Sequence, residues 1–266
     1  MNKHDVKIYQ SGKVIEVIRF GKLIYKDIQD KPPPSGRAKE ASEEDKLLNR
    51  AKVMSRARTE LRRIVGANDG QWKDSRGRPY KSVFLTLTFA DEVQDSQTAN
   101  HEFKLFMMRL GNVVKDRKNR NCLKYAVVPE IQEKRLKKYG VAVWHYHVII
   151  FNLPFIPWEK IRTAWGNGAI KINAIDHVDN VGAYVSKYMR DHIGDRTREK
   201  KSYFTSRGLY KPIKMEFDTD RKPQKEMLES VVKTAQALAV KKPYVVSHES
   251  DYFDLITYTQ YTLKDD

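Results

Sequence analysis

The sequence predicts an α+β protein whose core is a central antiparallel sheet with helices packed on one face. Two segments, Val83–Phe89 and Val141–Phe151, are almost entirely apolar or β-branched, which is typical of buried strands. Segments with apolar residues three and four positions apart, such as Ser96–Val114, lie between the strands and indicate amphipathic helices. The resulting order, β-α-β-β-α-β-α, is typical of ferredoxin-like and split βαβ folds.

The N-terminal region, residues 1–80, is expected to contain a hairpin, a linker and a basic helix. Alternating apolar and polar residues around Ser11-Gly12 predict a β-hairpin or small meander from Val6 to Asp27. A Pro-rich linker, Lys31–Gly36, follows the hairpin. After Ser42, apolar residues recur at helical spacing as far as Val65, and the opposite face is strongly basic.

The core is expected to span residues 81–215, and residues 216–266 are expected to form a C-terminal helical extension. The extension contains a predicted helix, Pro223–Val240, and a Tyr-rich tail. The core elements follow one another as strand 83–89, helix 96–114, strand 125–132, a charged turn at 134–140, strand 141–151, helix 157–165, strand 170–175 and helix 181–189.

The composition favours a polyanionic partner. The 266 residues include 50 Lys plus Arg against 34 Asp plus Glu, a formal net charge of +16, so nucleic acid is the first candidate. Neither a long apolar run nor a lipidation signature is present, and we expect a soluble, cytoplasmic protein with no membrane partner. The single cysteine, Cys122, excludes an internal disulfide and is too little for a zinc knuckle.

A pair of histidines on a predicted strand is a candidate metal site. His145 and His147 are two residues apart, so both imidazoles point from the same sheet face. The preceding strand carries Glu130, which can fall opposite the histidines if the two strands pair, and Gln132 and Glu133 are substitutes. Two imidazoles and a carboxylate suit Mg²⁺ or Mn²⁺. Taken alone, the pair also fits two polar residues on a half-exposed strand.

A predicted helix supplies candidate nucleophiles. Tyr184, Lys187 and Tyr188 are three and four residues apart and share one helix face. A phenol is a weak nucleophile at neutral pH, and a nearby lysine favours the phenolate in the transition state, so the group suits attack on a phosphodiester. An equally good interpretation of this helix alone is packing by the tyrosines, with the lysine reaching water.

These motifs, taken in order, resemble the HUH endonuclease superfamily, specifically rolling-circle replication initiators of plasmids and single-stranded DNA phages. Phe84–Phe89 resembles the first motif strand, His145-Tyr146-His147 the metal motif, and Tyr184–Tyr188 the nucleophile motif with its lysine. The resemblance spans about residues 82–190, with a weaker similarity at 206–209. Tyr146 departs from the pattern because it is bulkier than the usual aliphatic residue.

The resemblance implies a metal-dependent DNA nicking and joining enzyme. His145, His147 and Glu130 would hold Mg²⁺ or Mn²⁺, Tyr184 would be the nucleophile that forms a 5′-phosphotyrosine, and Tyr188 is a candidate second nucleophile. Relaxases place their tyrosine before the histidines, whereas here it follows them, which favours an initiator or a small transposase. Implied partners are single-stranded or hairpin origin DNA and a host helicase, because no ATP-binding loop is present.

Basic side chains are the expected phosphate contacts, although any one of them can equally be solvated surface. The opposing hypothesis is a non-catalytic DNA-binding regulator of replication, in which the histidines are incidental. The tryptophans can stack on bases, with core packing favoured at least for Trp165. The phosphate contacts expected are Arg56, Arg58, Arg62, Arg63, Lys134, Arg135, Lys137, Lys138, Arg196, Arg198, Lys200, Lys201 and Arg207.

Overall fold

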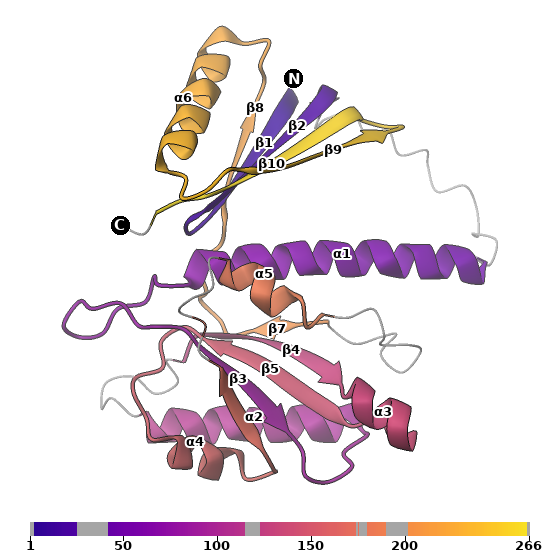
Figure 1. Cartoon of the computed structure of the whole chain (residues 1–266), viewed down its shortest axis with the longest axis vertical. Coiled ribbons are helices and arrows are strands. Elements are labelled where there is room, and N and C mark those ends of the chain that lie inside the picture. Colours follow the sequence, from indigo (N-terminus) through magenta and orange to yellow (C-terminus); the bar gives the residue numbers. More distant parts are fainter. Residues whose placement is uncertain are drawn as a thin grey trace. The chain divides into compact units, whose positions relative to one another are not determined.

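The chain forms two compact units, each built on a five-stranded antiparallel sheet (Figure 1). The computed structural model describes residues 3–25, 42–114, 123–173, 175, 180–189 and 202–264. The first unit combines Met1–Arg50 with Lys211–Asp266, and the second is Ala51–Tyr210. This mixture of helices and antiparallel sheets confirms the predicted α+β class.

The sheet of the second unit has the strand order β6-β3-β5-β4-β7. The connection from β3 to β4 leaves room for β5 between them, which is the split βαβ arrangement that the element order predicts. The central place of β5 agrees with its nearly complete burial. The bounds are β3 Val83–Thr88, β4 Tyr125–Ile131, β5 Trp144–Ile150, β6 Ile170–Asn173 and β7 Phe204–Thr205.

Helices cover both faces of this sheet, which corrects the expectation of helices on one face. The helices α2 (Ser96–Val113) and α4 (Trp158–Trp165) pack on one face, against Leu85, Leu87 and their neighbours. The alternate residues of the same strands, such as Phe84, form a second core with α1 (Glu43–Asn68) and α5 (Val181–Ser186). Strands with apolar residues at successive positions must be covered on both sides.

Local signals set where the helices of this unit begin and end. The Asp95 side chain accepts a hydrogen bond of 2.7 Å from the Thr98 backbone N–H and caps the start of α2. The predicted charged turn is instead a short helix, α3 (Glu133–Tyr139), which ends at Gly140 in the left-handed conformation, with φ 71°. The predicted pairing of the flanking strands is confirmed, since β4 and β5 are antiparallel neighbours.

The first unit joins strands from both ends of the chain. Its sheet has the order β8-β1-β2-β10-β9, and the predicted N-terminal hairpin is β1 with β2. One face is covered by α6, whose Leu228 and Ala235 pack against Ile8, Val17 and their neighbours. The bounds are β1 Lys3–Ser11, β2 Val14–Tyr25, β8 Ile213–Phe217, α6 Lys222–Leu238, β9 Tyr244–Ser250 and β10 Asp254–Thr262.

This division differs from the expected boundaries at residues 80/81 and 215/216. The C-terminal region is more than a helical extension, because its Tyr-rich tail forms the β9–β10 hairpin and β10 pairs with β2. The helix α1 is divided between the two units after Arg50. The Pro-rich linker at 31–36 and Cys122 lie outside the described residues.

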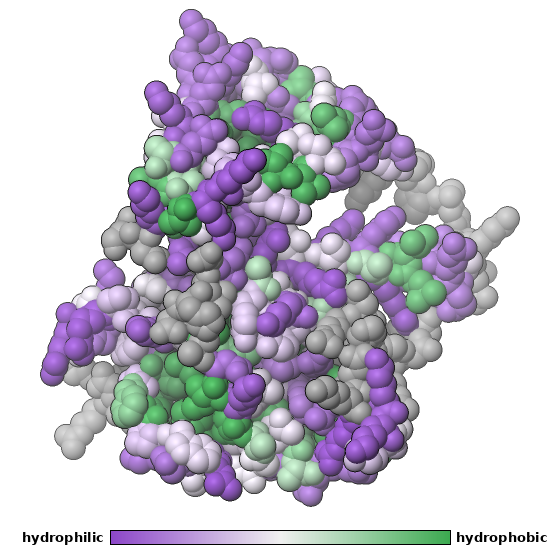
Figure 2. Space-filling view, viewed as in Figure 1, coloured by the Kyte–Doolittle hydropathy of each residue, from purple (hydrophilic) through white to green (hydrophobic). Residues whose placement is uncertain are grey.

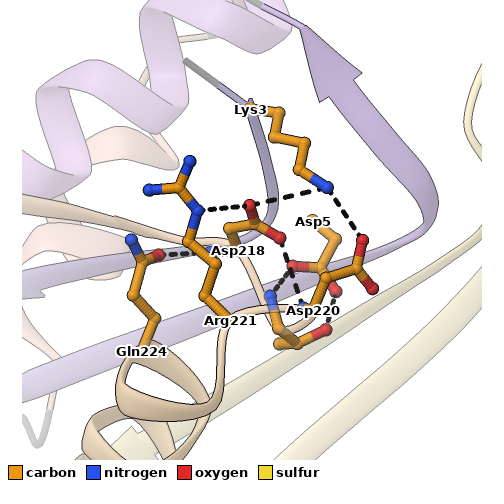
Figure 3. A network of polar contacts seen from close by, with 7 residues as sticks. Lys3, Asp5, Asp218, Asp220, Arg221 and Gln224 are labelled. Atoms are coloured by element: carbon orange, nitrogen blue, oxygen red, sulfur yellow. Dashed lines mark hydrogen bonds and ion pairs between the residues drawn. The ribbon is translucent and has the colours of Figure 1, made fainter. Parts of the chain in front are cut away.

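A polar network connects β1 to the start of α6 (Figure 3). The Asp218 side chain is almost completely buried and lies 3.7 Å from Lys3 Nζ and 3.2 Å from Arg221 Nε. The Thr219 backbone N–H donates a hydrogen bond of 2.9 Å to Asp5, and Lys3 forms a second ion pair, of 2.9 Å, with Asp220. Residues about 215 positions apart in the sequence are therefore held together by charge as well as by strand pairing.

We expect the substitution Asp218→Asn to lower the free energy of unfolding of the first unit by about 1–3 kcal/mol, because a buried ionic partner of two cations is lost. Asp220→Asn is the matched control. Its carboxylate is 64% exposed, so we expect a loss of at most about 1 kcal/mol.

Urea denaturation followed by far-UV circular dichroism measures the change. All four tryptophans lie in the second unit, so tryptophan fluorescence should report an unchanged transition if the units unfold independently. Equal effects of the two substitutions would contradict the structural role of Asp218.

Candidate active site

Strand register brings the predicted metal-binding residues to one face of the second unit's sheet. In β5, His145 lies between Thr88 of β3 and Glu130 of β4. His147 lies opposite Thr86. The side chains of these residues project toward the same side because each is separated from the next on its strand by two positions.

His147 is held by hydrogen bonds on both ring nitrogens. A hydrogen bond of 3.2 Å joins Thr86 Oγ1 to Nδ1, and one of 2.6 Å joins Glu130 Oε2 to Nε2. The His147 side chain is only 6% exposed, and that of Glu130 is 15% exposed. The imidazole orientation is therefore set from both sides by neighbouring strands.

His145 is a neutral imidazole at pH 7. Burial lowers its pKa to about 4, the nearby His147 and Arg135 act in the same direction, and Glu130 opposes them. Its Nε2 atom is buried and makes no hydrogen bond within the described part of the chain. A neutral nitrogen with its lone pair uncommitted is a donor of the kind that transition metals accept.

The three residues are neighbours but do not surround a common point. Among the described residues, no three His, Cys, Asp or Glu side chains are arranged to hold a metal ion. The direct bond between His147 and Glu130 would have to open for both to bind one ion. Of the substitutes, Gln132 has a buried Oε1 without a hydrogen bond in the described structure, and the Glu133 side chain is outside the described set.

The predicted tyrosine helix packs on the same face as the histidines. The Asn180 side chain accepts a hydrogen bond of 2.8 Å from the Ala183 N–H and starts α5. The helix ends at Ser186, earlier than predicted, so Lys187 and Tyr188 occupy the turn after it. The Tyr188 ring is stacked on His147 with 4.0 Å between ring centroids and 25° between planes.

Phe84 of β3 supports this arrangement from the sheet. Its ring is parallel to the His147 ring within 7° at 6.0 Å, and it contacts the Tyr188 ring at 5.2 Å and the Tyr184 ring at 5.3 Å. Sequence reasoning missed this role, because a phenylalanine in a buried strand is ordinary core. Its contacts show that the first motif strand carries the ring against which the aromatic site packs.

The two phenols and the lysine form a compact group. The Tyr188 hydroxyl donates a hydrogen bond of 3.4 Å to the Tyr184 hydroxyl. The Lys187 ammonium lies over the Tyr184 ring, 3.7 Å from its centroid, and 5.0 Å from that of Tyr188. The shared placement of these three side chains, expected from their spacing, is present in the structure.

Tyr146, between the two histidines, points to the opposite face. It is completely buried, donates a hydrogen bond of 2.7 Å to Asn100 and stacks on Phe103 at 4.8 Å. Burial raises the pKa of its phenol. The bulky ring that departs from the family pattern is thus accommodated under α2 and does not enter the candidate site.

Positive charge is concentrated in the unit that carries the site. Ala51–Tyr210 contains 30 of the 50 Lys and Arg residues and 16 of the 34 Asp and Glu residues, a surplus of 14, whereas the first unit has 20 against 18. Hydrophilic side chains cover most of the face shown in Figure 2. This distribution suits a polyanion bound to the second unit.

The expected phosphate contacts differ in their surroundings. Arg56, Lys137, Lys138 and Arg207 are exposed, whereas Arg58 is half-buried and donates a hydrogen bond to the Met189 carbonyl. Arg62, Arg63 and Arg135 are also half-buried. Outside the described structure lie Arg196, Arg198, Lys200, Lys201 and the side chain of Lys134.

The tryptophans divide in the same way. Trp165 is fully buried, as favoured, and Trp144 nearly so, while Trp158 is 47% exposed. In the described part of the chain, none of the helices is both long enough and apolar enough to cross a membrane.

Comparison with known proteins gives one match. Residues 82–193 match the model of a family described as Replication-associated protein, of the ORF2 type. No curated protein and no solved structure matches the chain. The matched range contains β3 to α5 and therefore every residue of the candidate site. This similarity supports a role in DNA replication.

Proposed function

We propose that this protein is a rolling-circle replication initiator of the HUH type, which nicks one DNA strand and rejoins it through a 5′-phosphotyrosine. The proposal rests above all on the stacking of Tyr188 on His147 at 4.0 Å. Through that contact the phenols and the imidazoles, which come from distant segments, lie on the same side of one sheet. The family match over the same residues supports the replication role.

The proposed reaction is a transesterification. The Tyr184 oxygen attacks the scissile phosphorus, and the bond from phosphorus to the 3′ oxygen breaks. The phenol proton leaves to water, by way of the Tyr188 hydroxyl, and the departing 3′ oxygen takes up a proton. Because a phosphodiester replaces a phosphodiester, a free 3′ hydroxyl can reverse the step and rejoin DNA without ATP.

Lys187 would contribute electrostatically. Its ammonium lies over the Tyr184 ring, where positive charge stabilises the negative charge that develops during attack. Tyr188, hydrogen-bonded to Tyr184, can orient the nucleophile, and it is positioned to act as a second nucleophile in rejoining.

His145, His147 and Glu130 are the residues that would hold a divalent cation, Mg²⁺ or Mn²⁺. The donor set fits: His145 is neutral with an unpartnered buried Nε2, and His147 Nε2 already faces a carboxylate. When bound, the ion would supply positive charge to the scissile phosphate. Thr86 orients His147 by the bond to Nδ1, as outer residues commonly do for a histidine ligand.

The proposed substrate is single-stranded or hairpin origin DNA in the cytoplasm, bound through the charge surplus of the second unit. Unwinding would come from a host helicase. A non-catalytic regulator of replication would use the same charge without covalent chemistry, and an HUH transposase would use the same chemistry on other DNA ends. The adduct assay below separates the first of these from the proposal.

We expect Tyr184→Phe to abolish a covalent protein–DNA adduct that the wild type forms with single-stranded DNA of its replicon in the presence of Mn²⁺. A label at the 3′ end of the DNA should move with the protein on a denaturing gel, whereas a 5′ label should not, because the tyrosine keeps the 5′ phosphate.

Tyr188→Phe is the matched control and should retain the adduct. An adduct that persists in Tyr184→Phe but disappears in Tyr188→Phe would transfer the nucleophile to Tyr188. Labelled protein in both variants, or no adduct with the wild type, would overturn the proposed chemistry.

We expect Mn²⁺ to stabilise the wild type and not the variants His145→Ala and His147→Ala, each compared with its own metal-free form. At a concentration 100 times the dissociation constant, the stabilisation should be about 2.7 kcal/mol, measured by thermal or chemical denaturation. The exposed His248, in the first unit, gives the control His248→Ala, which should respond like the wild type. An identical response of all four proteins would reject this site.

A further inference from the structure

We infer that the helix α1 is a positioning element of the active site, and that Gly182 and Arg58 are the two contacts by which it aligns the tyrosines. This inference rests on the proposed function. The whole of α1 precedes the stretch that matches the family model, so that match assigns it no role. Two independent contacts connect it to α5, one near each end of the tyrosine segment.

The first contact is a direct approach of the two helix backbones at Gly182. A Cβ atom at this position would lie 2.2 Å from the Arg62 carbonyl oxygen and 3.0 Å from the Arg62 carbonyl carbon. Because the obstructing atoms are backbone in the middle of a helix, they cannot rotate away. Only glycine allows α5 to lie this close to α1, and any side chain there must push the two helices apart.

The second contact binds the other end of the segment. Arg58 Nε donates a hydrogen bond of 2.6 Å to the carbonyl oxygen of Met189, whose side chain is buried. The last carbonyls of a helix have no partner within it, and a cation there also meets the negative end of the helix dipole. Arg58 therefore holds the turn that carries Lys187 and Tyr188.

Apolar packing joins the two contacts. Leu61 and Val65 of α1 are fully buried in one core with Val181 and Val185 of α5. The helix α5 has only six residues and cannot be stable by itself, so its position depends on the surface against which it lies. With α1 on one side and Phe84 and His147 on the other, the tyrosines are held between two rigid elements.

This role differs from the phosphate contact that its charge suggests for Arg58, and the two roles have different consequences. Loss of a phosphate contact weakens DNA binding and reduces its salt dependence. Loss of a positioning contact leaves DNA affinity unchanged and slows cleavage by bound protein, because a displacement of about 1 Å costs on the order of 100-fold in rate.

The test uses the full chain with the variants Gly182→Ala and Arg58→Met, and with Lys52→Met as a control. Lys52 is exposed on the same helix, so its substitution removes the same charge without touching α5. The first readout is hydrogen exchange of the backbone amides of residues 183–189, measured by mass spectrometry. We expect exchange at least about tenfold faster in Gly182→Ala and Arg58→Met, and unchanged in Lys52→Met.

The second readout is single-turnover cleavage of bound single-stranded DNA. We expect a decrease on the order of 100-fold for Gly182→Ala and about tenfold for Arg58→Met, with dissociation constants within about twofold of the wild type.

Wild-type exchange and cleavage in both variants would overturn the inference while leaving the proposed function intact. Weaker DNA binding of Arg58→Met, with exchange unchanged, would make Arg58 a phosphate contact and equally reject the positioning role. If the wild type forms no adduct at all, the proposed function fails, and the exchange measurement alone decides whether α1 holds α5.

Discussion

Hydrogen bonding on both edges of β5 is the constraint on which the candidate site depends. Because this strand pairs with β3 on one side and β4 on the other, a slip of one residue would break two ladders and turn every side chain to the opposite face. Tyr146 would then face α5, and the histidines would enter the apolar layer beneath α2. The register of three strands thus decides which functional groups meet the tyrosines.

The sequence predicts the parts of this arrangement that depend on short-range pattern. Spacing by two residues placed both histidines on one face, and spacing by three and four placed Tyr184 with Lys187. The pairing of β4 with β5 followed from their proximity along the chain. The same alternation in Val83–Phe89 also contained a missed signal: apolar residues on both faces required helices on both sides of the sheet.

Other features depend on partners that no local pattern reveals. Arg58 looked like one more cation of a basic helix, and only the position of Met189, 131 residues away, gives it a specific contact. Gly182 is ordinary until the Arg62 backbone is placed beside it. The Tyr-rich tail alternates like a strand, but its partner β2 lies near the other end of the chain, so it was not assigned to a sheet.

The sheet shared by both ends of the chain has a consequence for synthesis on the ribosome. Strands β1 and β2 emerge first, yet a two-stranded hairpin is marginally stable alone, and three of the five strands of its sheet follow residue 210. The unit that carries the tyrosines is complete earlier, since all of its residues precede Lys211. Translation therefore finishes the candidate catalytic unit before the unit whose first strands were made at the outset, and the nascent hairpin must wait exposed until β8, β9 and β10 arrive.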